Sequence, residues 1–176
     1  MDDADATADR VRERGATIAV GPLALGQGRA VLAADRDGAT FGFWEGNAPA
    51  WSVGHDSAPA RLDLHTRDVF ESATFYSEVF GWARPPGGCT LDYAETSIVV
   101  QASGHNVATL RATVPDPQDQ ARWITDFHVQ DTGRAVEAAI AAGGQPSPLL
   151  PECGTGTGTT CGIRDPGGAL FTVSHP

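Results

Sequence analysis

The chain has 176 residues, of which 41% are hydrophobic and 19% are charged, a composition typical of a globular protein with one or two domains. Its formal net charge is −10, and the dispersed acidic residues argue against a nucleic acid as partner. All 12 basic residues are arginine, so the sequence excludes the lysine chemistry of Schiff bases, pyridoxal phosphate and P-loops.

Two further features of the sequence concern the cellular compartment. No apolar run approaches the roughly 18 residues that a membrane-spanning helix needs, and the first residues, "MDDADATADR", are polar. The three cysteines, Cys89, Cys153 and Cys161, are an odd number without a CxxC pair, which predicts reduced thiols and no disulfide framework. We therefore expect a cytoplasmic protein with no membrane partner.

The N-terminal part, residues 1–46, is predicted to contain one helix followed by three strands. The helix covers "DADATADRVRERGA" from Asp3, and the strands lie near residues 17–25, 29–34 and 39–44. The stretch over residues 47–60 is rich in Ala, Pro and Ser, and we interpret it as a linker.

The middle part, residues 61–114, is predicted to contain a strand, a helix and further strands. "RLDLHTR" alternates between apolar and polar residues as a half-buried strand does. In "DVFESATFYSEVFGW", which follows, the apolar residues stand three or four positions apart, as on one face of a helix. Asp68 is interpreted as the N-cap of this helix, and Gly81 as its end. Strands are then predicted in "CTLDYAETSIVVQA" and "HNVATLRATV".

The last part, residues 122–176, repeats this order. "WITDFHVQ" is predicted as a strand, "DTGRAVEAAIAAGG" as a helix capped by Asp131, and two strands bracket a turn at Asp165. The turn sequence "DPGGALFTV" from Asp165 parallels "DRDGATFGF" from Asp35. The sequence therefore predicts an α+β fold of repeated βαβββ units, two of them complete and the N-terminal one truncated.

This repeat resembles a known superfamily. A βαβββ unit with "FYSEVFGW" closing its helix and "DPGGALF" opening its last strand is similar to the vicinal oxygen chelate superfamily, also called the glyoxalase/bleomycin-resistance/extradiol-dioxygenase fold. The resemblance implies that two units pair, so that their curled mixed sheets enclose a cavity. It does not imply one activity, because the superfamily includes isomerases, thiol transferases, ring-cleaving dioxygenases and proteins that only sequester a drug.

The resemblance also implies where a metal would be held in the metalloenzymes of the superfamily. Their ligands come from the first and last strands of the units, and these positions correspond here to Arg61, Ile124, Thr172 and Gly42. None of the four can hold a metal in the manner of the superfamily. We therefore expect no cofactor, with an unconventional divalent metal as the alternative.

A second repeat concerns polar residues of the two first strands. "RLDLHTRD" and "ITDFHVQD" each contain Asp-x-His-x-x-Asp, and the two copies stand at one fixed spacing along the chain. Side chains alternate along a strand, so both Asp-x-His pairs share a face with the ligand positions and are predicted to line the cavity. These four residues are Asp63, His65, Asp126 and His128. The apolar residues predicted to pack on the opposite face, under the helices, are Leu62, Leu64, Phe127 and Val129.

The Asp-x-His repeat is open to three interpretations. Each histidine is satisfied by a nearby aspartate without any ligand, or the polar cavity binds a small molecule, or the four residues perform acid–base catalysis or hold a metal. The function favoured is binding of a small polar or aromatic metabolite. The alternative is a lyase, isomerase or dioxygenase/hydroxylase-type enzyme. The substrate-binding candidates are Arg61, Asp63, His65, Asp126 and His128, and His65 and His128 are also the catalytic candidates.

The truncated N-terminal unit predicts an association. It lacks a first strand, and its last strand carries the apolar residues Phe41, Phe43 and Trp44. Unpaired strand edges and one-sided apolar faces favour association. We expect a homodimer in which this segment pairs with its copy, and packing against the rest of the same chain is the alternative.

Overall fold

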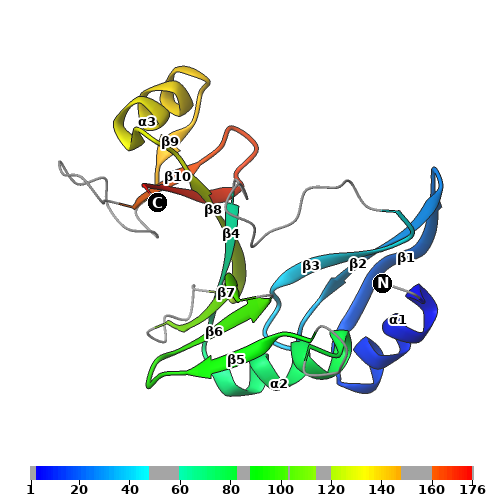
Figure 1. Cartoon of the computed structure of the whole chain (residues 1–176). Coiled ribbons are helices and arrows are strands. Elements are labelled where there is room, and N and C mark those ends of the chain that lie inside the picture. The colour runs from blue at the N-terminus through cyan, green and yellow to red at the C-terminus, as the bar shows by residue number, and fades with distance from the viewer. Residues whose placement is uncertain are drawn as a thin grey trace. The chain divides into compact units, whose positions relative to one another are not determined.

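The computed structural model describes residues 3–47, 60–82, 88–102, 104–113, 120–147 and 160–175. The elements occur in three groups along the chain (Figure 1). The first group is α1 (Ala4–Glu13), β1 (Thr17–Leu25), β2 (Gly28–Ala34) and β3 (Thr40–Glu45). The second is β4 (Ala60–Thr66), α2 (Val69–Phe80), β5 (Thr90–Tyr93), β6 (Ser97–Ala102) and β7 (His105–Ala112). The third is β8 (Arg122–His128), α3 (Thr132–Ala141), β9 (Gln145–Pro146), β10 (Cys161–Arg164) and β11 (Leu170–Ser174).

This order of elements confirms the predicted α+β fold class. The second and third groups each contain a strand, a helix and three strands, and the first contains a helix and three strands. The two-residue strand β9 was not predicted, because so short a segment carries no periodicity. Most of the predicted linker over residues 47–60 lies outside the described residues.

The helix ends lie where the capping residues predicted them. Asp68 Oδ1 accepts hydrogen bonds from the backbone N–H groups of Phe70, at 3.0 Å, and Glu71, at 2.9 Å. Asp131 Oδ1 accepts one from the N–H of Arg134 at 2.9 Å. Gly81 ends α2 with φ 66°, a left-handed conformation that glycine adopts without steric cost. Both aspartates are therefore confirmed as N-caps.

The chain divides into two compact units. The first comprises residues 1–52 and 64–123, and the second comprises residues 53–63 and 124–176. In the first unit, β1, β2 and β3 form an antiparallel sheet, and β5, β6 and β7 are antiparallel neighbours. In the second unit the strand order is β8-β11-β10-β9, with β8 parallel to β11.

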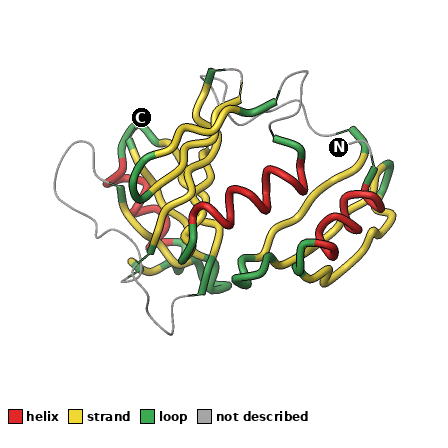
Figure 2. The backbone as a smooth tube through the Cα atoms, turned by 90° about the horizontal axis from the view of Figure 1, so that it is seen from below, coloured by secondary structure: helices red, strands yellow, loops and turns green. Residues whose placement is uncertain are grey.

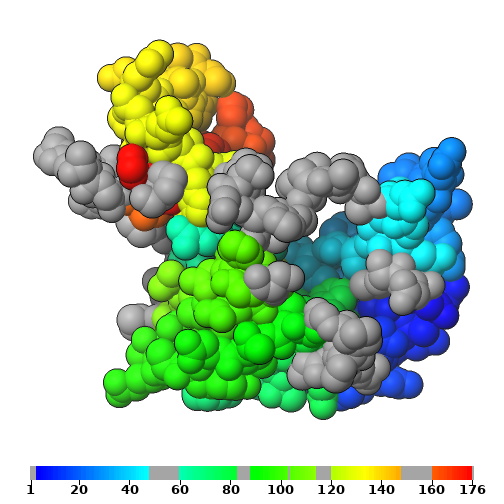
Figure 3. All heavy atoms as spheres, in the orientation of Figure 1, coloured from blue at the N-terminus to red at the C-terminus, as the bar shows by residue number. Residues whose placement is uncertain are grey.

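In the first unit, the N-terminal segment packs against α2. Arg10 of α1 donates from Nε to the carbonyl oxygen of Val79 in α2 at 2.9 Å. The Phe41 ring lies edge-on to the rings of Tyr76 and Phe80, at centroid distances of 5.4 and 5.9 Å. The helix near the N-terminus lies along strands in Figure 2, and the blue N-terminal segment lies beside the green part of the chain in Figure 3, in agreement with the contacts of α1 with β1, β2, β3 and α2.

This packing covers the apolar residues of β3 within the same chain. Phe43 is buried and Phe41 is packed against the core, so these side chains are not available to a second copy as the sequence suggested. The N-terminal segment thus packs against another part of the same chain, which was the alternative expectation for it. The homodimer itself stays a prediction.

The second unit has a smaller core. Cys161, Ile163 and Val173 are buried, and Val129 and Phe171 pack against them. No residue of α3 is buried, whereas six residues of α2 are. None of the described helices is long and apolar enough to cross a membrane.

One prediction about the cysteines is wrong. Cys161 is disulfide-bonded, and its partner lies outside the described residues. Cys89 is free, and burial raises the pKa of its thiol. Sequence spacing could not reveal the disulfide, because bond formation depends on the distance between the two sulfur atoms in the fold.

Candidate functional site

Asp126 is the buried carboxylate among the described residues of the second unit. This residue lies in β8, is 7% exposed, and stands opposite Thr172 in the parallel pairing of β8 with β11. Its Oδ1 accepts a hydrogen bond from the hydroxyl of Thr172 at 2.8 Å, and its Oδ2 accepts one from Ser174 at 2.7 Å. The register of the two strands therefore supplies one donor for each carboxylate oxygen, which offsets the cost of burying the charge.

An imidazole and a guanidinium complete this group. His128, two residues after Asp126 on the same strand, places Nε2 at 3.5 Å from Asp126 Oδ2. Arg61 of β4 donates from Nε to the same His128 nitrogen at 2.7 Å. We call the five residues Arg61, Asp126, His128, Thr172 and Ser174 the Asp126 cluster, and all of them belong to the second unit.

The Asp126 cluster unites three of the five predicted substrate-binding residues. Arg61 contacts the imidazole of His128. Asp63 falls in the second unit and His65 in the first. The predicted convergence of both Asp-x-His pairs on one cavity therefore stays a prediction.

The predicted division of the two strands into a polar and an apolar face is partly wrong. Leu64 is fully buried, and Val129 packs against the core of the second unit, as expected. Leu62 and Phe127, however, are 37% and 40% exposed, whereas the carboxylate of Asp126 is buried. Alternation assigns a side chain to a face, but the hydroxyls of β11 decide that the Asp126 face is covered.

A second buried aspartate lies in the first unit and was not predicted to have a role. Tyr76 donates its hydroxyl to Asp35 Oδ2 at 2.9 Å, and the indole N–H of Trp123 donates to the Tyr76 oxygen at 2.9 Å. Asp35 Oδ1 accepts from the backbone N–H groups of Ala39, at 2.8 Å, and Asp37, at 3.0 Å. We call Asp35, Tyr76 and Trp123 the Asp35 cluster.

Burial sets the protonation of the Asp35 cluster. Desolvation raises the pKa of Asp35, although the hydrogen bonds from Tyr76 and the backbone oppose the shift. Desolvation also raises the pKa of the Tyr76 phenol above its usual range, and the negative charge of Asp35 adds to this. The sequence feature that pointed to Asp35 was the similarity of its turn to the turn at Asp165. The two turns make the same contact, because Asp165 Oδ1 accepts from the N–H of Ala169 at 2.8 Å, as Asp35 Oδ1 does from that of Ala39.

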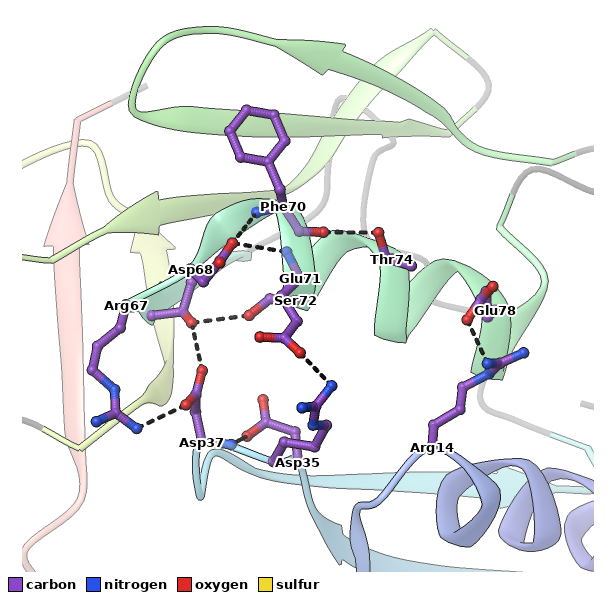
Figure 4. A network of polar contacts seen from close by, with 12 residues as sticks. Arg14, Asp35, Asp37, Arg67, Asp68, Phe70, Glu71, Ser72, Thr74 and Glu78 are labelled. Carbon is purple, nitrogen blue, oxygen red and sulfur yellow. Dashed lines mark hydrogen bonds and ion pairs between the residues drawn. The ribbon is translucent and has the colours of Figure 1, made fainter.

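A groove of about 390 Å³ in the first unit is the other candidate. It lies between the end of α1 and the outer side of α2 and is lined mainly by charged side chains (Figure 4). Arg14 forms an ion pair with Glu78 at 2.6 Å, and Arg36 forms one with Glu71. Because these charges already neutralise each other at an exposed site, the groove offers little to a charged ligand.

The donor set does not fit the metal that the superfamily resemblance implies. Thr172 uses its hydroxyl to donate to Asp126, and Ile124 is a buried aliphatic residue. Arg61 is permanently positive, so it opposes a cation next to His128. Within the described ranges, no group of three or more His, Cys, Asp or Glu side chains is placed to hold a metal.

Comparisons with known proteins agree with this fold. The model of the family described as "Glyoxalase-like domain" matches residues 59–174. The anthracycline biosynthesis protein DnrV of Streptomyces peucetius is 31% identical over 127 residues, which cover 66% of this chain and 46% of that protein. The putative glyoxylase CFP32 of Mycobacterium tuberculosis is 28% identical, over all of this chain and 67% of that protein.

Solved structures show the same fold at low sequence identity. The Mn(II)-bound glyoxalase from Novosphingobium aromaticivorans superposes with a TM-score of 0.56 at 16% identity, covering 97% of this chain and 58% of that one. The 2,3-dioxygenase LapB from Pseudomonas sp. KL28 gives 0.54 at 14% identity, covering 100% and 69%. This chain spans less than half the length of DnrV and two thirds of CFP32. The family model, which covers most of the chain, shows that it belongs to the glyoxalase-like domain family.

Proposed function

We propose that this protein binds a small polar or aromatic metabolite through the Asp126 cluster and without the divalent metal of the metalloenzymes. The observation that carries the proposal is the arrangement of Arg61, His128 and Asp126. Arg61 donates to the imidazole of His128 beside the buried carboxylate of Asp126, and the guanidinium and the imidazole both still have nitrogen atoms without a partner among the described residues. A few oriented polar groups are what a small-molecule site needs.

The relatives support a small-molecule ligand. Two of them are named for anthracycline biosynthesis and others are named as putative glyoxylases, so the names refer to the chemistry of small compounds. The net charge of −10 argues against a polyanionic macromolecule as ligand.

An enzyme that uses His128 as general base is the second candidate. The observation in its favour is the Asp126 carboxylate at 3.5 Å from His128 Nε2, where it would stabilise an imidazolium. The nitrogen that would take the proton, however, already accepts the hydrogen bond from Arg61. A base in this state is not available to a substrate, so we rank binding above catalysis.

A thermal-shift screen tests the proposal. Protein purified without a histidine tag and treated with a chelator is screened against small polar and aromatic compounds. We expect at least one compound to raise Tm, since a ligand at about 100 times its Kd stabilises by about 2.7 kcal/mol. The shift should be lost in Arg61→Ala. A shift that appears only with a stoichiometric divalent metal, or that survives in Arg61→Ala, would contradict the proposal.

A further inference from the structure

The hydrogen bond between Arg61 and His128 assigns the proton on the imidazole. A guanidinium nitrogen can only donate, so His128 Nε2, at 2.7 Å from Arg61 Nε, must accept. The neutral imidazole then carries its proton on Nδ1. Asp126 Oδ2, at 3.5 Å from Nε2, faces a lone pair in this state and receives no hydrogen bond from the ring.

An inventory of the remaining groups shows what the cluster lacks. Each oxygen of Asp126 already accepts a hydrogen bond from a hydroxyl, of Thr172 or of Ser174. The terminal nitrogens of Arg61 and Nδ1 of His128 have no hydrogen-bond partner among the residues that the structure describes. All of these are N–H groups. The Asp126 cluster therefore offers unfilled donors, which suit a ligand that brings acceptors.

We propose that the ligand of this site is an anion, such as an aromatic carboxylate, bound by Arg61 and His128, and that a proton on His128 strengthens its binding. This inference rests on the proposed function and adds to it the chemical class of the ligand and a control by pH. Arg61 is suited to the role because its planar fork of N–H groups matches the two oxygens of a carboxylate.

The control by pH follows from two arrangements that exclude each other. When His128 is protonated, Nε2 becomes a donor and cannot face the N–H of Arg61. The nearest acceptor is Asp126 Oδ2, so the imidazolium pairs with this carboxylate and Arg61 Nε is released. A free Nε–H then gives the guanidinium a second pair of parallel donors, Nε and a terminal nitrogen, in addition to its two terminal nitrogens.

The charges in the cluster give the sign of the effect. Among the described residues, Arg61 from β4 and Asp126 from β8 are the charged groups in contact with His128, and β11 places the uncharged Ser174 opposite it. Asp63 and His65 are the further titratable groups on the same face of β4 as Arg61. The charges of Arg61 and Asp126 cancel when His128 is neutral. When His128 is protonated, the three side chains together carry one positive charge. Anion affinity therefore rises as the pH falls and His128 takes up its proton.

Calorimetric titration with benzoate, benzamide and sulfate tests the inference on the full chain. Benzamide is the uncharged match of benzoate, and sulfate is an anion without a ring. When the pH is lowered from about 8.5 to about 5.5, we expect benzoate affinity to rise roughly five- to tenfold. Benzamide should bind more weakly than benzoate and without this change.

Three variants separate the two residues, and a fourth, at His105, is the control. Arg61→Gln should abolish benzoate binding at every pH, and Arg61→Lys, which keeps the charge but not the fork, should retain part of it. His128→Gln cannot be protonated and should bind benzoate with no change over the pH range. His105→Gln, which removes a histidine of β7 in the first unit, should keep the dependence on pH. Circular dichroism of each variant shows whether it is folded.

The outcomes distinguish this inference from the proposed function. Equal affinity for benzamide and benzoate, or no saturable binding of either anion, would overturn the anionic class while small-molecule binding in the thermal screen still stands. A dependence on pH that persists in His128→Gln would overturn the control by His128. NMR of the imidazole nitrogens gives an independent measurement, because neutral His128 must carry its proton on Nδ1. A proton on Nε2 would contradict the assignment on which the inference depends.

Discussion

The two units each bury an aspartate, and the comparison of Asp35 with Asp126 separates a structural group from a candidate binding group. Asp35 accepts from Tyr76 and from two backbone N–H groups, and Tyr76 accepts from Trp123. The hydrogen-bonding capacity of this cluster is thus used within the protein. The Asp126 carboxylate is also satisfied, but the imidazole and the guanidinium beside it keep unfilled donors. Burial of an aspartate therefore does not by itself mark a binding site, whereas unused hydrogen-bond donors around it do.

The largest expected effect is on stability in the Asp35 cluster. Asp35→Ala leaves the hydroxyl of Tyr76, which is 1% exposed, without its acceptor, and it removes the acceptor of the Ala39 N–H group. We expect the free energy of unfolding to fall by about 3 kcal/mol, since each buried partner left unsatisfied costs about 1–3 kcal/mol. Urea denaturation measures this loss. Asp165→Ala is the matched control, because it removes the same turn contact without a buried tyrosine, and we expect about 1 kcal/mol there. Equal losses in the two variants would contradict a special role for Asp35.

The next effect concerns the hydroxyls that cover Asp126. The double variant Thr172→Val with Ser174→Ala removes the donor to each carboxylate oxygen while keeping the backbone pairing of β11. We expect a loss of about 2 kcal/mol by urea denaturation, because a buried carboxylate is left with fewer hydrogen bonds. Arg61→Gln removes no hydrogen bond to Asp126, so it should lower the free energy of unfolding by less than the double variant does. If the double variant were as stable as the unaltered protein, the two hydroxyls would not be needed to hold the carboxylate.

The Asp35 cluster is also expected to make stability depend on alkaline pH, through Tyr76. Burial raises the pKa of Tyr76 in the folded protein above the ordinary value of 10.0, whereas in the unfolded chain the phenol ionises near that value. The folded state therefore holds more protons above about pH 10, and stability falls there by roughly 1.4 kcal/mol per pH unit. The contribution of Tyr76 is fully present below that pH and is lost as the pH rises.

Tyrosinate absorbance checks this prediction. The chain has two tyrosines, so in a Tyr93→Phe background the signal reports Tyr76 alone. We expect the absorbance to appear together with unfolding and not before it. Ionisation of Tyr76 in a protein that is still folded would show that the Asp35 cluster is open to solvent.

The smallest effect is expected from the third member of the Asp35 cluster. Trp123→Phe removes the indole donor to the Tyr76 oxygen, but Tyr76 still donates to Asp35. We expect a loss of about 1 kcal/mol, the contribution of one ordinary hydrogen bond, by thermal or urea unfolding. A loss as large as that of Asp35→Ala would mean that the tryptophan, and not the aspartate, holds the cluster together.

Local patterns in the sequence determined much of the fold. Asp68 and Asp131 were assigned as helix caps and Gly81 as a helix end, and all three assignments are correct, because a cap acts on the first or last turn of its own helix. The turns at Asp35 and Asp165 were matched from their residues, and they make the same hydrogen bond at the same length. Periodicity also placed Asp126 and His128 together on one face of a strand.

Only the tertiary structure decided which of these residues meet. The pairing of Arg61 with His128 joins residues 67 positions apart, and the hydroxyl of Ser174 reaches Asp126 across 48 positions. Periodicity assigns a side chain to a face of its strand, but it does not give the register between strands or the residues that cover that face. For this reason the sequence identified His128 and Asp126 as candidates, whereas the covering hydroxyls, the Asp35 cluster and the disulfide of Cys161 emerged from the packing of distant segments.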